Sequence, residues 1–127
     1  LPQLLAAADL ASNIVIDVPA VWNNSANKFF DALASGTPIL INGGGWQADL
    51  IEKYEAGVVV FGLNLPQAAL KINNFLCDKT KQHNASKNAH IIAEKYFDKN
   101  DLVKTIEVTL LLSINNKDKN FSVLDLK

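Results

Sequence analysis

Three short apolar runs without polar alternation constrain the fold of this chain more than any other feature. They occupy residues 14–16, 38–42 and 58–61 and read Ile-Val-Ile, Pro-Ile-Leu-Ile-Asn and Val-Val-Val-Phe. Each run is short enough for a strand, and the stretches between the runs place apolar residues at helical spacing. Continuously apolar strands separated by helices are typical of a parallel sheet that is covered on both faces. The sequence therefore predicts an α/β fold in three layers, with helices on both faces of a parallel sheet.

The expected elements follow from this spacing and from helix end signals. The first strand is expected within 11–18, the second at 38–42 and the third at 58–61. A helix over 26–35 should stop at Gly36, because glycine adopts the left-handed conformation that commonly ends helices, and Pro38 follows just beyond. The other helices are expected at residues 1–9, 46–57, 66–77 and 84–97, with a last helix that Asp98 or Asn100 could cap.

Composition excludes several classes of function. The chain has 127 residues, 49% of them hydrophobic, and a net charge of −1, so we expect one globular domain and no nucleic-acid partner. No apolar run is long enough to span a bilayer. The single Cys rules out a disulfide framework. His83 and His90 lie roughly 10 Å apart along a helix, too far to share a metal ion. We therefore expect no metal site.

The sequence also reads as a piece of a longer protein. It contains no Met, even at position 1, and no Arg, and it begins in a helical pattern. Three strands would also make a narrow sheet for this architecture. We expect a partial domain over residues 1–112 and a polar tail over 113–127. The strand at 13–17 would then have a bare edge, so we expect the chain to self-associate through it.

Ligands of parallel α/β sheets bind beyond the carboxyl ends of the strands, where a polar segment precedes the helix at 26–35. Residues 23–28 read Asn-Asn-Ser-Ala-Asn-Lys. Free N–H groups at a helix start attract anions, phosphate above all. Asn24 and Ser25 are also good N-cap residues, so capping alone would explain them. Lys28 would oppose the helix dipole, a conflict that a bound anion would remove; a solvated Lys is the alternative.

Two further candidates lie near this segment. Asp31 shares the polar face of the helix, where it could accept hydrogen bonds from a sugar diol, although periodicity alone favours a solvated side chain. Gly43, Gly44 and Gly45 follow the second strand, and glycines let a backbone approach a ligand closely. A tight turn between strand and helix explains these glycines nearly as well, and they match neither a dinucleotide-binding motif nor a P-loop.

The block at 23–42, NNSANKFFDALASGTPILIN, resembles the donor-binding helix of GT-B glycosyltransferases, and it is most similar to the retaining group known as family 4. Those proteins usually have two Glu separated by seven residues, then Ala-x-x-x-Gly-x-Pro and a hydrophobic strand. Here Asn23 and Asp31 keep that spacing, and Ala-Leu-Ala-Ser-Gly-Thr-Pro follows. The segments at 1–9, 44–50 and 94–98 also resemble the family, so the similarity covers roughly residues 1–112.

The resemblance implies the carboxy-terminal portion of a Rossmann-like donor domain, which binds a UDP- or GDP-sugar without a cofactor or metal. Asp31 would hold the ribose hydroxyls. Asn23 stands where the family has a Glu that contacts the sugar, which is a departure from the pattern. Backbone groups at 25–28 would meet the diphosphate, and Lys28 would balance its charge. The implied donor-binding residues are Asn23, Asn24, Ser25, Asn27, Lys28 and Asp31, with loop contacts at Gly43, Gly44 and Gly45.

The resemblance further implies a full-length transferase of hexosyl groups in polysaccharide biosynthesis. Its amino-terminal domain would bind a glycan or lipid-linked acceptor, and the enzyme would work in the cytoplasm, at the inner membrane face if peripheral. We expect residues 1–127 alone to be inactive, because charge stabilisation and positioning need the remaining groups. Two alternatives stay open: a nonenzymatic nucleotide-binding or protein-interaction domain, and a GT-B sugar epimerase.

Overall fold

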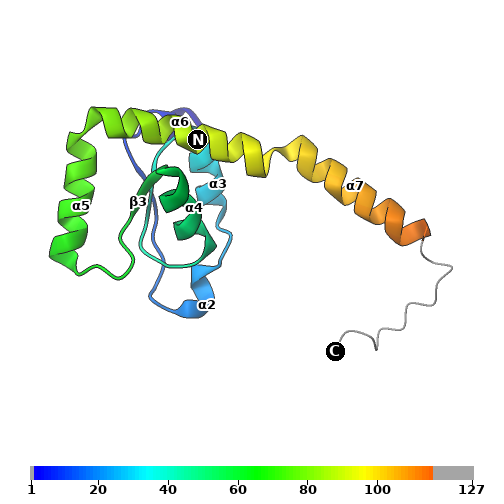
Figure 1. Cartoon of the computed structure of the whole chain (residues 1–127), viewed down its shortest axis with the longest axis horizontal. Helices are drawn as coiled ribbons and strands as arrows, with labels where there is room; N and C mark the ends of the chain where they lie inside the picture. The colour runs from blue at the N-terminus through cyan, green and yellow to red at the C-terminus, as the bar shows by residue number, and fades with distance from the viewer. Residues whose placement is uncertain (1, 116–127) are drawn as a thin grey trace. The chain divides into compact units, whose positions relative to one another are not determined.

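The computed structural model describes residues 2–115, which divide into two units between residues 96 and 97 (Figure 1). The helices and strands of the first unit follow one another along the chain as α1 (Pro2–Ala6), β1 (Ala11–Asn13), α2 (Pro19–Trp22), α3 (Asn27–Ala34), β2 (Ile39–Ile41), α4 (Trp46–Tyr54), β3 (Gly57–Val59), α5 (Leu65–Cys77) and α6 (Lys79–Phe97), whose last residue belongs to the second unit. In the second unit, α7 spans Lys99–Asn115.

The three strands form one parallel sheet in the order β1-β2-β3. Ile39 of β2 pairs with Ala11 on one side and with Gly57 on the other. α3 connects β1 to β2, and α4 connects β2 to β3, so each parallel pair is joined through a helix. This topology confirms the predicted α/β class.

One face of the sheet packs against α3 and α4. Ile39 and Ile41 of β2 are buried there, because alternate side chains of a strand point to the same face. Phe29 and Leu33 of α3 and Ile51 of α4 are also fully buried. At roughly 1.5–3 kcal/mol for each large apolar side chain removed from water, this layer supplies much of the stability of the first unit.

The alternate residues of the strands pack against a second set of helices. Val58 of β3 forms a buried cluster with Phe75 of α5 and Ala85 of α6. Leu40 and Val60 pack against the same cluster. The strands are therefore apolar on both sides because helices contact both, which is the physical reason for the unalternated runs in the sequence.

The end of α3 forms as predicted. Gly36 has φ +65°, in the left-handed region that favours glycine. Its N–H bonds to the C=O of Leu33 (3.0 Å), and the N–H of Thr37 bonds to the C=O of Ala32 (2.9 Å). These two bonds form a Schellman motif, which ends the helix and turns the chain into β2.

The first strand differs from its prediction. β1 covers only Ala11–Asn13, and Ile14 and Ile16 beyond it are 49% and 70% exposed. The predicted buried strand through 14–16 is wrong, because the side chain of Asn42 binds both backbone groups of Val15 and takes the place of a neighbouring strand. β1 does lie at the edge of the sheet.

In the second unit, Asp98 caps α7. Its Oδ1 accepts hydrogen bonds from the N–H groups of Asn100 (2.8 Å) and Asp101 (3.2 Å), so the structure selects Asp98 from the two predicted candidates, Asp98 and Asn100. The predicted boundary at 112 falls inside α7, whereas the two compact units meet between 96 and 97. Residues 116–127 of the predicted polar tail lie outside the described residues.

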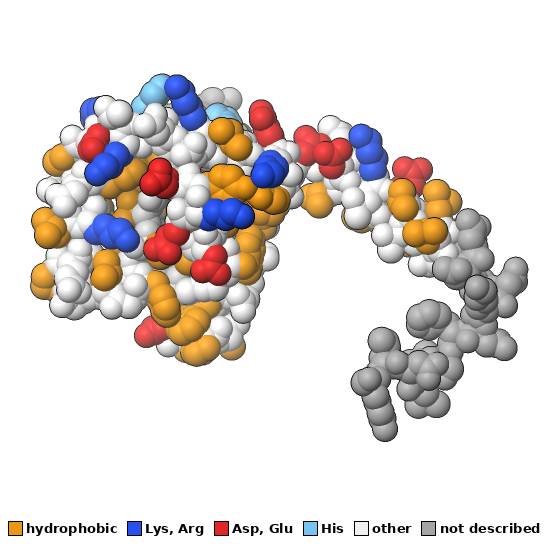
Figure 2. Space-filling view, in the orientation of Figure 1, with side chains coloured by type: hydrophobic (Ala, Val, Ile, Leu, Met, Phe, Trp, Pro, Cys, Tyr) orange, Lys and Arg blue, Asp and Glu red, His pale blue; other side chains and the backbone are white. Residues whose placement is uncertain are grey.

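Among residues 2–115, no helix is both long and apolar enough to cross a membrane. Figure 2 shows acidic and basic side chains interspersed on the face of the first unit that it presents. No surface of one sign dominates that face, in keeping with the nearly neutral composition.

Candidate functional site

The segments that follow the three strands meet at one edge of the sheet, because parallel strands all end on the same side. Asn42, just after β2, binds the segment after β1: its Oδ1 accepts from the N–H of Val15 (2.9 Å) and its Nδ2 donates to the C=O of Val15 (2.8 Å). Trp22 packs edge-on against Phe61, which follows β3, with 4.9 Å between ring centroids. Side chains therefore join all three segments.

A buried amide chain fixes the approach to α3. Asn13 and Gln47 are each only 2% exposed. The Nδ2 of Asn13 donates to the Oε1 of Gln47 (2.7 Å), and the Nε2 of Gln47 donates to the C=O of Asn24 (3.0 Å). Gln47 thus connects the end of β1, the first turn of α4 and the segment before α3. Gln47 lies in the segment 44–50 that resembles the glycosyltransferase family, but sequence reasoning assigned this residue no role.

The glycine segment after β2 packs against protein side chains. A Cβ on Gly44 would lie 3.2 Å from the ring of Phe61, and one on Gly43 would lie 3.0 Å from Val15. Gly45 has φ +86°, and its Cβ would lie 2.6 Å from Oδ1 of Asn23. Gly45 is therefore required by its backbone conformation and its closeness to Asn23, whereas a side chain at Gly43 or Gly44 would crowd its neighbours. The predicted contact of these glycines with a ligand stays a prediction.

The start of α3 is open. The helix begins at Asn27 with Ala26 at the N-cap position, and no side chain caps it. Capping by Asn24 or Ser25, the alternative explanation for these two residues, is therefore wrong. Within residues 2–115, the N–H groups of Asn27 and Lys28 make no hydrogen bond. These amides are the kind of donors that bind an anion at a helix start.

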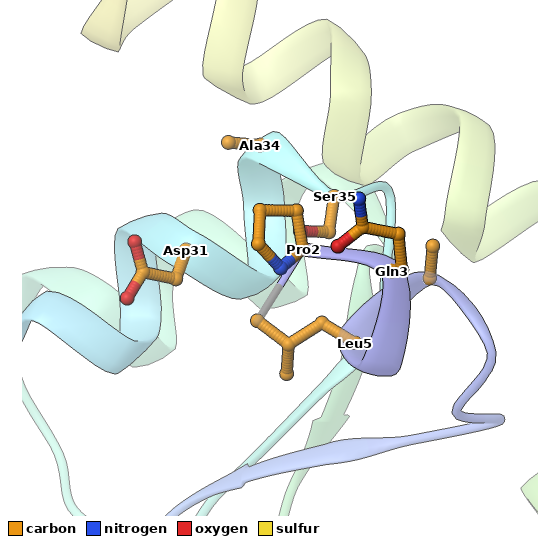
Figure 3. Close-up of a pocket in the computed structure, with 7 residues that line it drawn as sticks. Pro2, Gln3, Leu5, Asp31, Ala34 and Ser35 are labelled. Atoms are coloured by element: carbon orange, nitrogen blue, oxygen red, sulfur yellow. The ribbon is translucent and has the colours of Figure 1, made fainter.

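The predicted donor-binding residues are brought together on the surface around this helix start. All six side chains are exposed: Asn23, Asn24, Ser25, Asn27, Lys28 and Asp31. Asp31 also borders a cavity of about 430 Å³ between α1 and α3, together with Pro2 and Ser35. In Figure 3 the carboxylate of Asp31 points away from those two residues, so this group is available to solvent beside the cavity.

A second cavity, of about 610 Å³, lies at the carboxyl ends of β2 and β3. Its lining includes the polar side chains Asp17, Asn42 and Asn64 and the aromatic side chains Trp22 and Phe61. Trp22 and Asn42 lie in the loops at 18–27 and 42–46, where the strand order predicts a ligand, whereas no role was predicted for Phe61 and Asn64. The position of these two after the third strand was the signal that could have identified them, because such loops form the ligand-binding edge of parallel sheets. The buried Nε1 of Trp22 has no hydrogen-bond partner within the described residues.

The pKa shifts lie away from this edge. Tyr54 ends α4, and its hydroxyl is 2.6 Å from that of Tyr96 and 3.1 Å from the ammonium of Lys95. The hydrogen bond with Tyr96, and next that from Lys95, lower the pKa of Tyr54. The hydrogen bond between Lys95 and the Tyr54 hydroxyl also raises the pKa of Lys95. A hydrogen bond from the N–H of Lys81 lowers the pKa of Asp78.

The fold and this edge define an α/β domain with a parallel sheet and an open helix start beside its carboxyl edge. Within the part of the chain that the structure describes, no group of three or more His, Cys, Asp or Glu could hold a metal ion. No family model matches the chain, and comparison with curated proteins and with solved structures gave no match either.

Proposed function

We propose that this chain is the carboxy-terminal part of the donor-binding domain of a GT-B glycosyltransferase. The full enzyme would transfer a hexosyl group from a UDP- or GDP-sugar to a glycan or lipid-linked acceptor. Helix contacts on both sides of the parallel sheet suit the three-layer Rossmann-like architecture of such a domain.

One observation carries the proposal: the uncapped start of α3 coincides with the polar segment that resembles the donor-binding motif. The N–H groups of Asn27 and Lys28 are free among the described residues, and the Lys28 side chain is exposed beside them. A diphosphate at this point would accept hydrogen bonds from the amides and would neutralise Lys28.

The proposed roles follow from position along the helix. Asp31 lies four residues after Asn27, which is roughly 6 Å along the axis. A carboxylate at that distance from the phosphates would accept hydrogen bonds from the ribose hydroxyls of the same nucleotide. Asn23, just before the helix, would contact the donor sugar through its amide, which can both donate and accept hydrogen bonds.

The test is calorimetric titration of the chain with UDP, GDP and uridine at low salt. We expect the diphosphates to bind and uridine to bind much more weakly, because the phosphates make the charge-assisted contacts. Asp31→Ala should weaken UDP binding about ten- to hundredfold, the equivalent of hydrogen bonds to a charged group. Glu94→Ala, which removes an exposed carboxylate on α6, is the matched control and should leave binding unchanged.

A charge reversal at Lys28 separates a binding role from a structural one. Lys28→Glu puts an anion in the first turn of α3, so it should stabilise the free chain by about 0.3–1 kcal/mol. The same change should abolish diphosphate binding, because it places like charges together. A chain that binds neither UDP nor GDP at millimolar concentration, or that binds both equally well after Asp31→Ala and Lys28→Glu, would refute the proposal.

The other functional classes predict different results. Absence of nucleotide binding by the longer protein would favour an interaction module. Product analysis with the intact donor sugar, again in the longer protein, would distinguish transfer to an acceptor from epimerisation.

A further inference from the structure

The outer edge of β3 presents backbone groups that no strand occupies. The N–H of Ile39 bonds to the C=O of Ala56 (3.2 Å), and the N–H of Val60 bonds to the C=O of Ile41 (2.8 Å). Residues on a strand alternate in the direction of their backbone groups. The N–H and C=O groups of Gly57 and Val59 therefore point away from β2, toward the free edge.

One of these four groups already has a partner. The ammonium of Lys71, on α5, donates to the C=O of Val59 at 2.8 Å. Among residues 2–115, the N–H and C=O of Gly57 and the N–H of Val59 make no hydrogen bond. Two N–H donors and one C=O acceptor thus remain without a partner along the edge. They belong to residues two apart, which is the spacing at which a neighbouring β-strand forms hydrogen bonds.

The edge lies in a cavity of about 430 Å³. Glu52 and Glu55 line it from the end of α4, and Lys71 and Lys81 line it from α5 and α6. α4 packs on one face of the sheet, whereas α5 and α6 pack on the opposite face. The carboxylates and the ammonium groups therefore lie on opposite walls of the groove.

The floor between these walls is apolar. Ile51, Val59 and Phe75 line the cavity but are already 0%, 6% and 8% exposed, so an added chain would meet mainly the backbone groups of the edge and the charged walls. Figure 2 shows hydrophobic side chains between charged ones of both signs on the face over α4 and α5.

We propose that this groove binds an extended peptide, which adds to the sheet as a fourth strand beside β3. The free backbone groups select another strand, because only an extended main chain supplies donors and acceptors at the same period. The walls select the side chains of the peptide. Basic side chains on one face of the added strand lie near Glu52 and Glu55, and an acidic side chain on its opposite face lies near Lys81. This site is independent of the sugar-transfer proposal, since it lies at β3 and not at the start of α3.

Lys71 accounts for the fourth backbone group. A charged lysine at an open sheet edge discourages edge-to-edge pairing of two copies. In the complex Lys71 keeps its bond to Val59, and the peptide pairs with the three remaining groups.

The probe is the labelled peptide acetyl-Thr-Lys-Val-Lys-Glu-Thr-amide, whose two lysines share one face and whose valine and glutamate share the other. Binding is followed by fluorescence anisotropy, and amide hydrogen exchange is measured at Gly57 and Val59. We expect saturable binding and slower exchange at both amides. The double change Glu52→Gln with Glu55→Gln should weaken binding about three- to tenfold at low salt, since exposed ion pairs contribute little each. Glu94→Gln is the matched control.

Backbone methylation tests the strand geometry directly. One peptide is N-methylated at the valine and another at the second lysine. Because alternate N–H groups of a strand point to opposite edges, only one of the two peptides should lose binding. Absence of binding at millimolar peptide, or binding without protection of Gly57 and Val59, would overturn the proposal. Protection that appears without peptide at high protein concentration would overturn it in favour of a second copy.

Discussion

The buried amide chain through Gln47 makes a quantitative prediction about stability. In Gln47→Met, a change that keeps the shape of the side chain, the Nδ2 of Asn13 loses its partner at 2.7 Å while remaining 2% exposed. The C=O of Asn24 keeps a hydrogen bond from the N–H of Ala26 (3.1 Å), so it is not stranded. Leaving a buried donor unsatisfied costs about 1–3 kcal/mol, and we expect a loss of about 2 kcal/mol in the free energy of unfolding.

The partner change should cost less, and the pair should be non-additive. Asn13→Leu removes the donor to Gln47, but Nε2 of Gln47 keeps its bond to Asn24. It also removes Oδ1 of Asn13, a buried atom without a partner in the described residues. With both changes no buried amide is left unpaired, so the double variant should lose less than the sum of the single losses, by about 1–2 kcal/mol.

Urea unfolding followed by tryptophan fluorescence measures these differences. Trp22 and Trp46 both lie in the first unit, so their emission reports on the unfolding of the part that contains Gln47. With an m value of roughly 1.5 kcal/mol/M, a loss of about 2 kcal/mol lowers the urea midpoint by about 1.3 M. Gln3→Met, at an exposed position on α1, should change stability by less than about 0.5 kcal/mol.

Additivity would refute this reasoning. If the losses of the single variants summed to that of the double variant within about 0.5 kcal/mol, the two side chains would not be coupled. A loss below about 0.5 kcal/mol in Gln47→Met would show that water reaches the amide of Asn13 and replaces the lost bond.

Two further predictions concern the opposite end of the sheet. Gly57→Ala should destabilise the chain by about 2 kcal/mol or more, because the new Cβ would overlap the backbone of Ile39; an unchanged urea midpoint would contradict the close approach of these strands. In an alkaline titration followed by tyrosine absorbance, Tyr54 should ionise below the ordinary value of about 10, since Tyr96 and then Lys95 lower its pKa. Because that pKa is lowered in the folded state, ionisation favours folding as pH rises through this range, and Tyr54→Phe should remove the early component.

The sequence predicted best those elements whose determinants are local. The end of α3 depends on Gly36 and the residues just before it, which close the Schellman motif among themselves. β2 depends on a short apolar run that starts after Pro38 and packs against α3 and α4. In both segments the signal and the structure it specifies lie within a few residues, so local patterns were sufficient.

The segment at 14–16 shows where such reasoning fails. Its β-branched residues favour an extended chain, and the prediction of a buried strand depended on that preference. In the structure the chain leaves the sheet after Asn13, and Asn42 satisfies the backbone of Val15 from 27 residues away. A side chain so distant in sequence cannot be anticipated from a local pattern, although its effect on the strand is decisive.

The glycine segment illustrates the same limit at the candidate site. Three consecutive glycines after a strand predicted either a tight turn or close approach of a ligand. The structure provides a third reason, since Gly43 and Gly44 leave space for Trp22 and Phe61, aromatic residues from the segments after β1 and β3. Tertiary packing therefore favours glycine at these two positions, and the spacing of residues within one segment carries no information about that packing.

The amide chain also explains why the start of α3 is open. α5 is capped by Asn64 and α7 by Asp98, each through a side-chain oxygen that accepts backbone N–H groups. Before α3, Gln47 holds the C=O of Asn24 instead, and the chain then places Ala26, which has no side-chain oxygen, at the N-cap position. The contacts that fix this segment to the sheet thus leave the first amides of the helix without a cap. The hydrogen bonds of Gln47 to Asn13 and Asn24 therefore contribute both to the stability of the fold and to the geometry of the proposed donor site.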